Sequence, residues 1–181
     1  ILIGDTPKAK RRKNRLKGLR ASGRLWKHSS LADIDGVVSP QDLDDMFVFT
    51  LVRNPWDRMV SYYHWLRDQH FDHPAVGRAK VSSFSDFLNH PATQEALRAE
   101  TFVNYITLSD GQQRCDMILR QERLAQDTRT LGQRLGIDLA APVQVNVSRR
   151  RGDYRAYYTN KDAALLANLC RSDVGQFGYR F

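Results

Sequence analysis

The strongest hydrophobic pattern lies in the middle of the chain. Residues 46–52 read MFVFTLV, a near-continuous run of apolar, β-branched and aromatic side chains. Such a run is typical of a strand that is buried on both faces, as in a parallel sheet. From residue 54 the spacing becomes helical, and five apolar residues fall within an arc of about 120°. They are Trp56, Met59, Val60, Tyr63 and Leu66.

The pattern therefore predicts a strand, a sharp turn and a helix that starts near Pro55. The core-facing side of this helix is apolar, and the opposite face is mostly polar. That outer face carries Asn54, Asp57, Arg58, Ser61 and Trp65. We expect Ser61 to point away from the core.

Weaker patterns predict the other elements. Three hydroxyl residues suit helix caps: Ser39 before Pro40, Ser83 before a short helix through Leu88, and Thr159, with Asp162, before a helix to about residue 174. The remaining predicted elements are a short strand at 25–26, helical structure around 93–106, a strand at 115–119 and a helix at 122–135. In this last helix Leu124, Leu131 and Leu135 are expected to face inward, and Gly136 to end it.

Composition suits one globular domain over residues 1–181. The chain is 41% hydrophobic and 10% aromatic, which excludes wholesale disorder, a fibrous repeat and a disulfide mini-protein. Cys115 and Cys170 stand alone, so neither a zinc site nor a disulfide framework is indicated, and a reducing compartment is the simpler interpretation. No apolar run approaches the roughly 20 residues of a membrane-spanning helix, so we expect a soluble chain.

The net charge of +8 is concentrated in one segment. Residues 1–30 hold ten Lys and Arg and one acid, whereas the other 151 residues hold 18 basic and 19 acidic side chains. Residues 1–24 are expected to be flexible, and the basic segment, Lys8–Lys27, has three open interpretations. It is a nucleic-acid arm, a solvated loop, or a cationic wall for an anionic substrate.

The predicted turn after the central strand is the best candidate site. Ligands bind at the carboxyl ends of parallel strands, where a helix N-terminus offers unpaired N–H groups. Arg53 at the end of the strand can donate two parallel hydrogen bonds to a phosphate, and Ser61 adds a hydroxyl donor. The alternative is that Arg53 pairs with a surface carboxylate and Ser61 is merely a tolerated polar residue.

The residues Arg53-Asn-Pro55-Trp-Asp-Arg58-Met-Val-Ser61-Tyr-Tyr63 resemble a known motif. It is the 3′-phosphate-binding motif of sulfotransferases that use 3′-phosphoadenosine 5′-phosphosulfate (PAPS), R-[ND]-P-x-x-R-x-x-S-x-Y after a strand. The resemblance implies that Arg53 and Ser61 hold the 3′-phosphate. It also implies an α/β fold of the P-loop-NTPase-like kind, a three-layer sandwich with a mostly parallel sheet flanked by helices.

Two further stretches resemble this family, particularly its carbohydrate-type branch and related bacterial proteins. Residues 25–30, LWKHSS, lie where that branch carries a catalytic histidine, which implies that His28 is the base. Residues 146–158 and the final FGYRF resemble the C-terminal region, where a basic loop closes over the cofactor. This implies cofactor or substrate contacts for Arg149, Arg150 and Arg151. The resemblance spans about residues 25–181.

One family feature is missing. Members begin with a strand and a phosphosulfate-binding loop, P-K-[TS]-[GA]-[GST]-[TS], whereas residues 6–10 read TPKAK and keep only the Pro-Lys pair. We interpret this pair as coincidence and expect the first strand, the loop and its helix to be absent from this chain. Weak or absent catalysis by the chain alone is then expected.

The resulting hypothesis is a PAPS-dependent sulfotransferase. It is expected to move a sulfuryl group from PAPS to a hydroxyl or amine of a small-molecule or glycan acceptor and to release adenosine 3′,5′-bisphosphate. The reaction is expected to require no metal. The protein is expected to lie in the cytoplasm and not at a membrane. One alternative is a P-loop-type nucleotide kinase or phosphotransferase, although neither G-x-x-x-x-G-K-[ST] nor an acidic Mg²⁺ ligand is visible. The other is a non-enzymatic nucleic-acid-binding domain that uses the basic segment.

Overall fold

The computed structural model describes residues 6–15, 18–26, 28–142 and 152–181. The chain divides into two compact units. The first consists of Ile1–Thr50 and Phe102–Ile118, and the second of Leu51–Thr101 and Leu119–Phe181. The expectation of a single domain over residues 1–181 stays a prediction.

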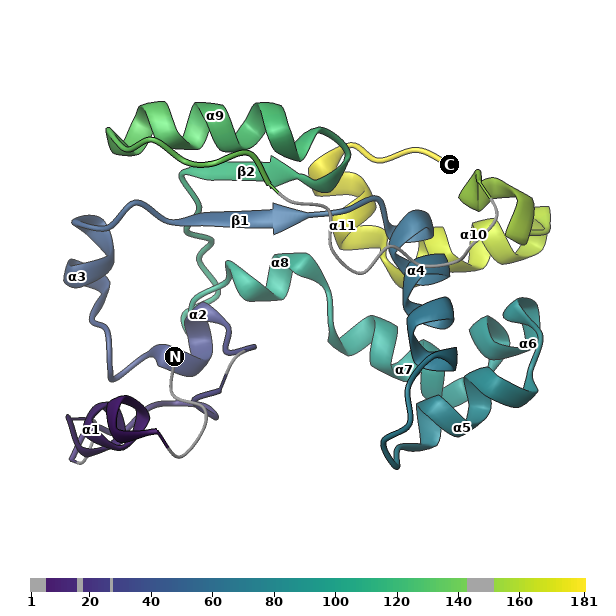
Figure 1. Cartoon of the computed structure of the whole chain (residues 1–181), viewed down its shortest axis with the longest axis horizontal. Helices are drawn as coiled ribbons and strands as arrows, with labels where there is room; N and C mark the ends of the chain where they lie inside the picture. Colours follow the sequence, from purple (N-terminus) through teal and green to yellow (C-terminus); the bar gives the residue numbers. More distant parts are fainter. Residues whose placement is uncertain (1–5, 16–17, 27, 143–151) are drawn as a thin grey trace. The chain divides into compact units, whose positions relative to one another are not determined.

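Strands β1 (Phe49–Val52) and β2 (Met117–Arg120) pair side by side and run in the same direction (Figure 1). At the start of the pair, the Val48 carbonyl accepts hydrogen bonds from the backbone N–H groups of Asp116, at 2.7 Å, and Met117, at 3.3 Å. Both strands were expected from their apolar runs, and the fold is mixed α/β with a small parallel sheet. The three-layer sandwich remains part of the proposal below.

The central strand is shorter and more exposed than predicted. Val52 is fully buried, but the side chains of Phe49 and Leu51 are 47% and 42% exposed. Phe49 and Leu51 are two residues apart and share one face of β1, which is exposed, whereas Val52 lies on the other face and is buried. The prediction of a strand buried on both faces is therefore wrong.

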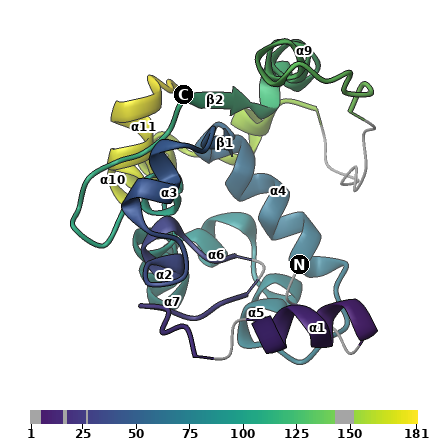
Figure 2. The same cartoon turned by 90° about the vertical axis from the view of Figure 1, so that its left-hand side faces the viewer.

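Helix α4 (Pro55–Arg67) leaves the end of β1 in both views (Figures 1 and 2) and organises the core of the second unit. All five predicted inward residues of α4 are buried, as the 3.6-residue spacing indicated. Around it pack α5 (Pro74–Val81), α6 (Phe84–Asn89), α10 (Asn160–Leu169) and the short η2 (Tyr154–Tyr157). The Tyr63 ring meets the rings of Phe84 and Phe87, each at 5.5 Å between centroids.

The predicted helix caps are confirmed. Ser39 caps α3 (Pro40–Asp44), Ser83 caps α6, and Thr159 forms a capping box with Asp162 at the start of α10. In each case the hydroxyl accepts a backbone N–H of the first turn, which satisfies a donor that the helix leaves unpaired. The last predicted helix is interrupted at Cys170, and α11 (Arg171–Phe177) follows as a separate helix.

Two other helical predictions hold in part. The stretch around 93–106 forms α7 (Pro91–Ala99) and α8 (Phe102–Tyr105), separated where Glu100 leaves helical geometry. The segment 122–135 forms η1 (Gln121–Arg123) and then α9 (Leu124–Leu135), which ends as predicted at Gly136 with φ +65°. Leu131 is buried, but Leu135 is 39% exposed and does not face a core.

Residues 25–26 do not form the predicted strand. The Ser29 hydroxyl oxygen accepts the Trp26 N–H at 2.8 Å and donates to the Arg24 carbonyl at 2.9 Å. A serine that bonds neighbouring backbone groups offers them a local turn in place of a sheet ladder. The two-residue apolar pattern was too short to overcome this competition.

The basic segment contains regular structure. Residues Pro7–Arg15 form helix α1, so the solvated loop does not describe this part of it, and the expected flexibility of residues 1–24 stays a prediction. The other helix of the first unit is α2 (Leu31–Ile34), which Ser30 caps. No helix among the described residues is both long enough and apolar enough to span a bilayer.

Candidate functional site

The turn between β1 and α4 is built around the Asn54 side chain. Its Oδ1 accepts the backbone N–H groups of Trp56, at 3.0 Å, and Asp57, at 3.3 Å. The Asn54 carbonyl accepts the N–H of Arg58 at 2.8 Å, and Pro55 has no N–H to offer. The asparagine is buried and caps the helix as its sequence position suggests.

This cap changes the expected chemistry of the turn. The sequence predicted that unpaired N–H groups at the helix N-terminus would receive an anion, but Asn54 already accepts them. The positive end of the α4 dipole is still present. An anion bound here must therefore be held by side chains, such as that of Arg53, and not by the backbone N–H groups.

Arg53 is paired with Asp57. Its Nε and Nη2 atoms each lie 2.7 Å from Asp57 Oδ2, and both side chains are about three-quarters buried or more, at 25% and 17% exposed. Among the described residues, Nη1 of Arg53 has no hydrogen-bond partner. The carboxylate pairing that the sequence left as an alternative thus exists, yet one edge of the guanidinium keeps its donors.

Ser61 lies half-buried on the outer face of α4. Asp57 lies four residues after Arg53 and four residues before Ser61. Its carboxylate therefore lies along the chain between Arg53 and Ser61, the two predicted phosphate ligands. The roles of Arg53 and Ser61 as phosphate ligands stay predictions.

A partly buried network that the sequence did not predict supports the turn. The Asn54 N–H donates to Glu122 Oε1 at 2.5 Å, and its Nδ2 donates to the Tyr154 hydroxyl at 3.3 Å and the Arg180 carbonyl at 3.4 Å. The Tyr179 hydroxyl donates to Glu122 Oε2 at 3.3 Å. The only available signal was the position of Glu122 two residues after the second strand, on the same edge of a parallel sheet as Asn54.

His28 lies in the first unit, in a turn after Trp26. Its side chain is exposed, and its ring packs edge-on against the Trp26 ring with 4.7 Å between centroids. Arg53 and Ser61 belong to the second unit. The three predicted cofactor-binding arginines, Arg149, Arg150 and Arg151, lie outside the described residues. Arg53 directly precedes the α4 cap and Ser61 lies within α4, and the roles assigned to Arg53, Ser61 and His28 stay predictions.

In the described ranges, no three His, Cys, Asp or Glu side chains gather as metal ligands would. Cys115 and Cys170 are free thiols, and burial raises the pKa of Cys170 to about 11, so this thiol is protonated at neutral pH. The expectation of metal-free catalysis stays a prediction.

A comparison with family models agrees with the motif. The model described as the sulfotransferase family matches residues 6–177, so the chain belongs to the sulfotransferase family. The match begins at residue 6 and takes in the basic segment, which the motifs had left outside the resemblance. Searches of curated proteins and of solved structures found no match. Family membership supports sulfuryl transfer as the general activity.

Proposed function

We propose that this protein transfers a sulfuryl group from PAPS to a hydroxyl or amine, and that Arg53 and Ser61 hold the 3′-phosphate of the donor. The observation that carries this proposal is the strand, turn and helix of residues 49–67, which presents an arginine and a serine of the family motif in a family member. A carbohydrate hydroxyl is the first acceptor class to test. The proposed fold is the P-loop-like three-layer sandwich of PAPS enzymes.

The chemistry of Arg53 supports the phosphate assignment. A guanidinium presents five N–H donors in a plane, and Asp57 accepts from only two of its nitrogens. Nη1 and the second N–H of Nη2 are left for phosphate oxygens, which suit such forked donation. The Ser61 hydroxyl adds a neutral donor farther along the same helix face.

In the proposed reaction, the acceptor oxygen or nitrogen attacks sulfur in line and the bond from sulfur to the bridging phosphate oxygen breaks. The sulfuryl group passes to the acceptor, and adenosine 3′,5′-bisphosphate leaves with the bridging electron pair. By analogy with phosphoryl transfer, the protein mainly positions the reactants and neutralises charge. We assign the acceptor's proton to the His28 imidazole, which acts as general base.

The family match favours this proposal over the phosphotransferase alternative. The nucleic-acid alternative rests on the basic segment, Lys8–Lys27, which lies within the matched range. Nucleic-acid binding would be supported instead by DNA binding that depends steeply on salt concentration. That binding should disappear when residues 6–24 are removed and should be unchanged in Arg53→Gln.

The decisive experiment isolates the 3′-phosphate. Isothermal titration calorimetry compares adenosine 3′,5′-bisphosphate with adenosine 5′-monophosphate, which lacks only that phosphate, for the unsubstituted chain and for Arg53→Gln and Ser61→Ala. Charge-assisted hydrogen bonds contribute about 1.5–3 kcal/mol, so the bisphosphate is expected to bind roughly tenfold or more tighter. That preference should nearly vanish in Arg53→Gln and shrink in Ser61→Ala.

Arg98→Gln on α7 is the matched control, because it removes one exposed positive charge from the same unit outside the motif. It should leave the preference for the bisphosphate unchanged. An unchanged preference in Arg53→Gln would remove the phosphate assignment.

A further inference from the structure

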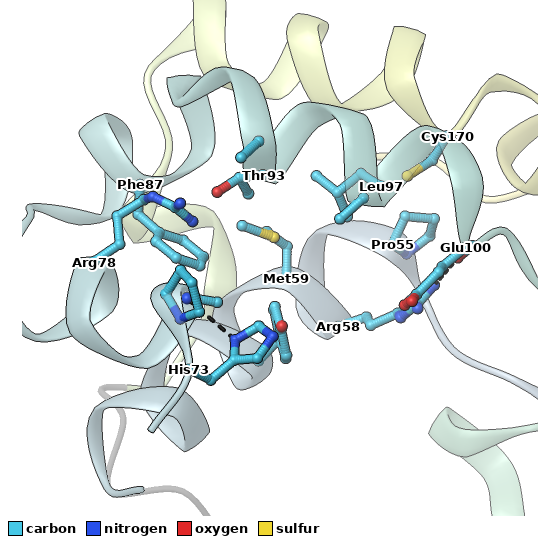
Figure 3. Close-up of a pocket in the computed structure, with 15 residues that line it drawn as sticks. Pro55, Arg58, Met59, His73, Arg78, Phe87, Thr93, Leu97, Glu100 and Cys170 are labelled. Carbon is cyan, nitrogen blue, oxygen red and sulfur yellow. Dashed lines mark hydrogen bonds between the residues drawn. The ribbon is translucent and has the colours of Figure 1, made fainter. Parts of the chain in front are cut away.

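A cavity of about 400 Å³ lies beside α4 within the second unit (Figure 3). Its volume is in the range of small-molecule binding sites. Apolar side chains from three helices form much of its wall: Met59 and Tyr62 of α4, Phe87 of α6 and Leu97 of α7. Neither Arg53 nor Ser61 lines it, so its ligand is separate from the proposed phosphate clamp.

Thr93 marks this cavity as more than a packing gap. Its side chain is 5% exposed, and its Oγ1 has no hydrogen-bond partner. Figure 3 shows the hydroxyl on the cavity side of α7. A buried hydroxyl without a partner costs free energy, because it has given up water and gained nothing in return. A ligand with an acceptor group would supply the missing bond.

The charge at the cavity favours an anion. Two guanidinium groups, of Arg58 and Arg78, line it against one carboxylate, of Glu100. Arg58 Nη1 donates to the Glu100 carbonyl at 3.2 Å. The Arg78 guanidinium, in contrast, makes no hydrogen bond or ion pair with any residue in the described ranges. Figure 3 shows its side chain at the cavity, beside Phe87.

Tyr62 and His73 complete the polar lining. Burial raises the pKa of Tyr62, and Glu100 raises it further while Arg58 and Arg78 lower it, so the hydroxyl is protonated at neutral pH and can donate. His73 Nδ1 is already used, because it accepts the Ala75 N–H at 3.2 Å at the start of α5. Thr93, Tyr62 and Arg78 thus each bring a hydrogen-bond donor to this cavity.

We propose that this cavity binds a small organic anion with a flat apolar body, such as an aryl sulfonate, sulfate or carboxylate. The anionic group accepts hydrogen bonds from Arg78 and Thr93, and the body packs against Met59, Tyr62 and Phe87. The proposal stands on the cavity alone and does not rest on sulfuryl transfer.

Calorimetry with two nearly isosteric probes tests it. The probes are 2-naphthalenesulfonate and the uncharged 2-naphthalenesulfonamide. The sulfonate is expected to bind one to one and at least about tenfold tighter than the sulfonamide, because both probes can accept a hydrogen bond from Arg78 but only the anion also forms an ion pair with it. Arg78→Gln should abolish that preference. Lys80→Gln, which removes an exposed charge from the same helix outside the cavity, should keep it.

Thr93→Val provides an independent test that does not depend on the arginine. The variant keeps the shape of the side chain and removes the unpartnered hydroxyl, so the ligand-free protein should melt at a higher temperature while sulfonate affinity falls about threefold or more. Arg53→Gln should leave sulfonate binding unchanged even if it abolishes bisphosphate binding. Three results would each overturn the proposal. They are the lack of saturable sulfonate binding, equal affinities for the two probes, and equal effects of Arg78→Gln and Lys80→Gln on the preference for the sulfonate.

Discussion

The Asp57 carboxylate holds Arg53 through two contacts of 2.7 Å, one turn of α4 before Ser61. A phosphate at Arg53 would therefore compete with a carboxylate for the same guanidinium. A partly exposed ion pair is worth up to about 1 kcal/mol, which corresponds to roughly fivefold in affinity. This pair sets how strongly Arg53 can attract an anion.

Asp57→Asn should accordingly strengthen binding of adenosine 3′,5′-bisphosphate by about two- to fivefold. The amide oxygen can still accept from Arg53, but the negative charge beside the phosphate is gone. Calorimetric titration at two salt concentrations measures the change, and the gain should be larger at low salt. Weaker binding in the variant would show instead that the charge of Asp57 is needed to orient Arg53.

His28→Ala should lower the turnover number about 10²- to 10⁴-fold if its imidazole is the general base. The measurement is the steady-state rate of sulfuryl transfer by the complete product of the gene, with bisphosphate affinity recorded in parallel. That affinity should not change, because His28 is assigned to the acceptor. His70→Ala, another exposed histidine, is the control and should retain full turnover. Equal rates for the two variants would exclude the base assignment.

Asn54→Ala should destabilise the second unit by about 2 kcal/mol or more. The substitution removes the cap of α4 and also the two hydrogen bonds from Nδ2 to Tyr154 and Arg180. Ser39→Ala removes an exposed cap from the short helix α3 and should cost only about 0.5–1 kcal/mol. Urea unfolding followed by circular dichroism compares the two. A smaller loss for Asn54→Ala than for Ser39→Ala would contradict the stabilising role of the hydrogen bonds around Asn54.

Acid should destabilise the protein through Asp162. Burial alone would raise the pKa of this carboxyl, but hydrogen bonds from Thr159, Asn89 and Ser85 together outweigh it and hold the pKa below its ordinary value. A lowered native pKa contributes stability that is present above the ordinary aspartate pKa of about 4 and is lost as pH falls through the native value.

The melting temperature should therefore fall less steeply below about pH 4 in Asp162→Asn than in the unsubstituted protein. At pH 7 the variant should be the less stable of the two, because an amide offers one acceptor oxygen where the carboxylate uses both. Thermal melts from pH 3 to 7 measure both effects. Parallel curves over this range would remove Asp162 as a source of acid sensitivity.

Two helical glycines should respond in opposite directions to alanine. A Cβ at Gly132 in α9 would lie 2.8 Å from the Ile137 carbonyl oxygen, so Gly132→Ala should destabilise the protein despite alanine's higher helix propensity. At Gly175 in α11 nothing lies within 4 Å of the added carbon, and Gly175→Ala should stabilise by about 0.5–1 kcal/mol. Thermal melts of both variants show whether each substitution raises or lowers the melting temperature. A higher melting temperature for Gly132→Ala would contradict the predicted clash with the Ile137 carbonyl oxygen.

The features that the sequence predicted well are local ones. The caps at Ser39, Ser83 and Thr159 and the buried face of α4 depend on residues within about four positions of one another. A hydroxyl three residues before an aspartate, or an apolar stripe at helical spacing, specifies its structure almost without regard to the rest of the chain. The family motif at Arg53 is equally local, and the family match agrees with it.

Only the tertiary structure decided which groups are paired and which are buried. Asn54 bonds Glu122 and Arg180, which lie 68 and 126 positions away, and no periodicity indicates such partners. Phe49 and Leu51 read as buried but are exposed, because their environment depends on whether other strands and helices cover them. Thr93 has an ordinary helical position in the sequence, and its unpartnered hydroxyl becomes visible only when distant helices meet around one cavity.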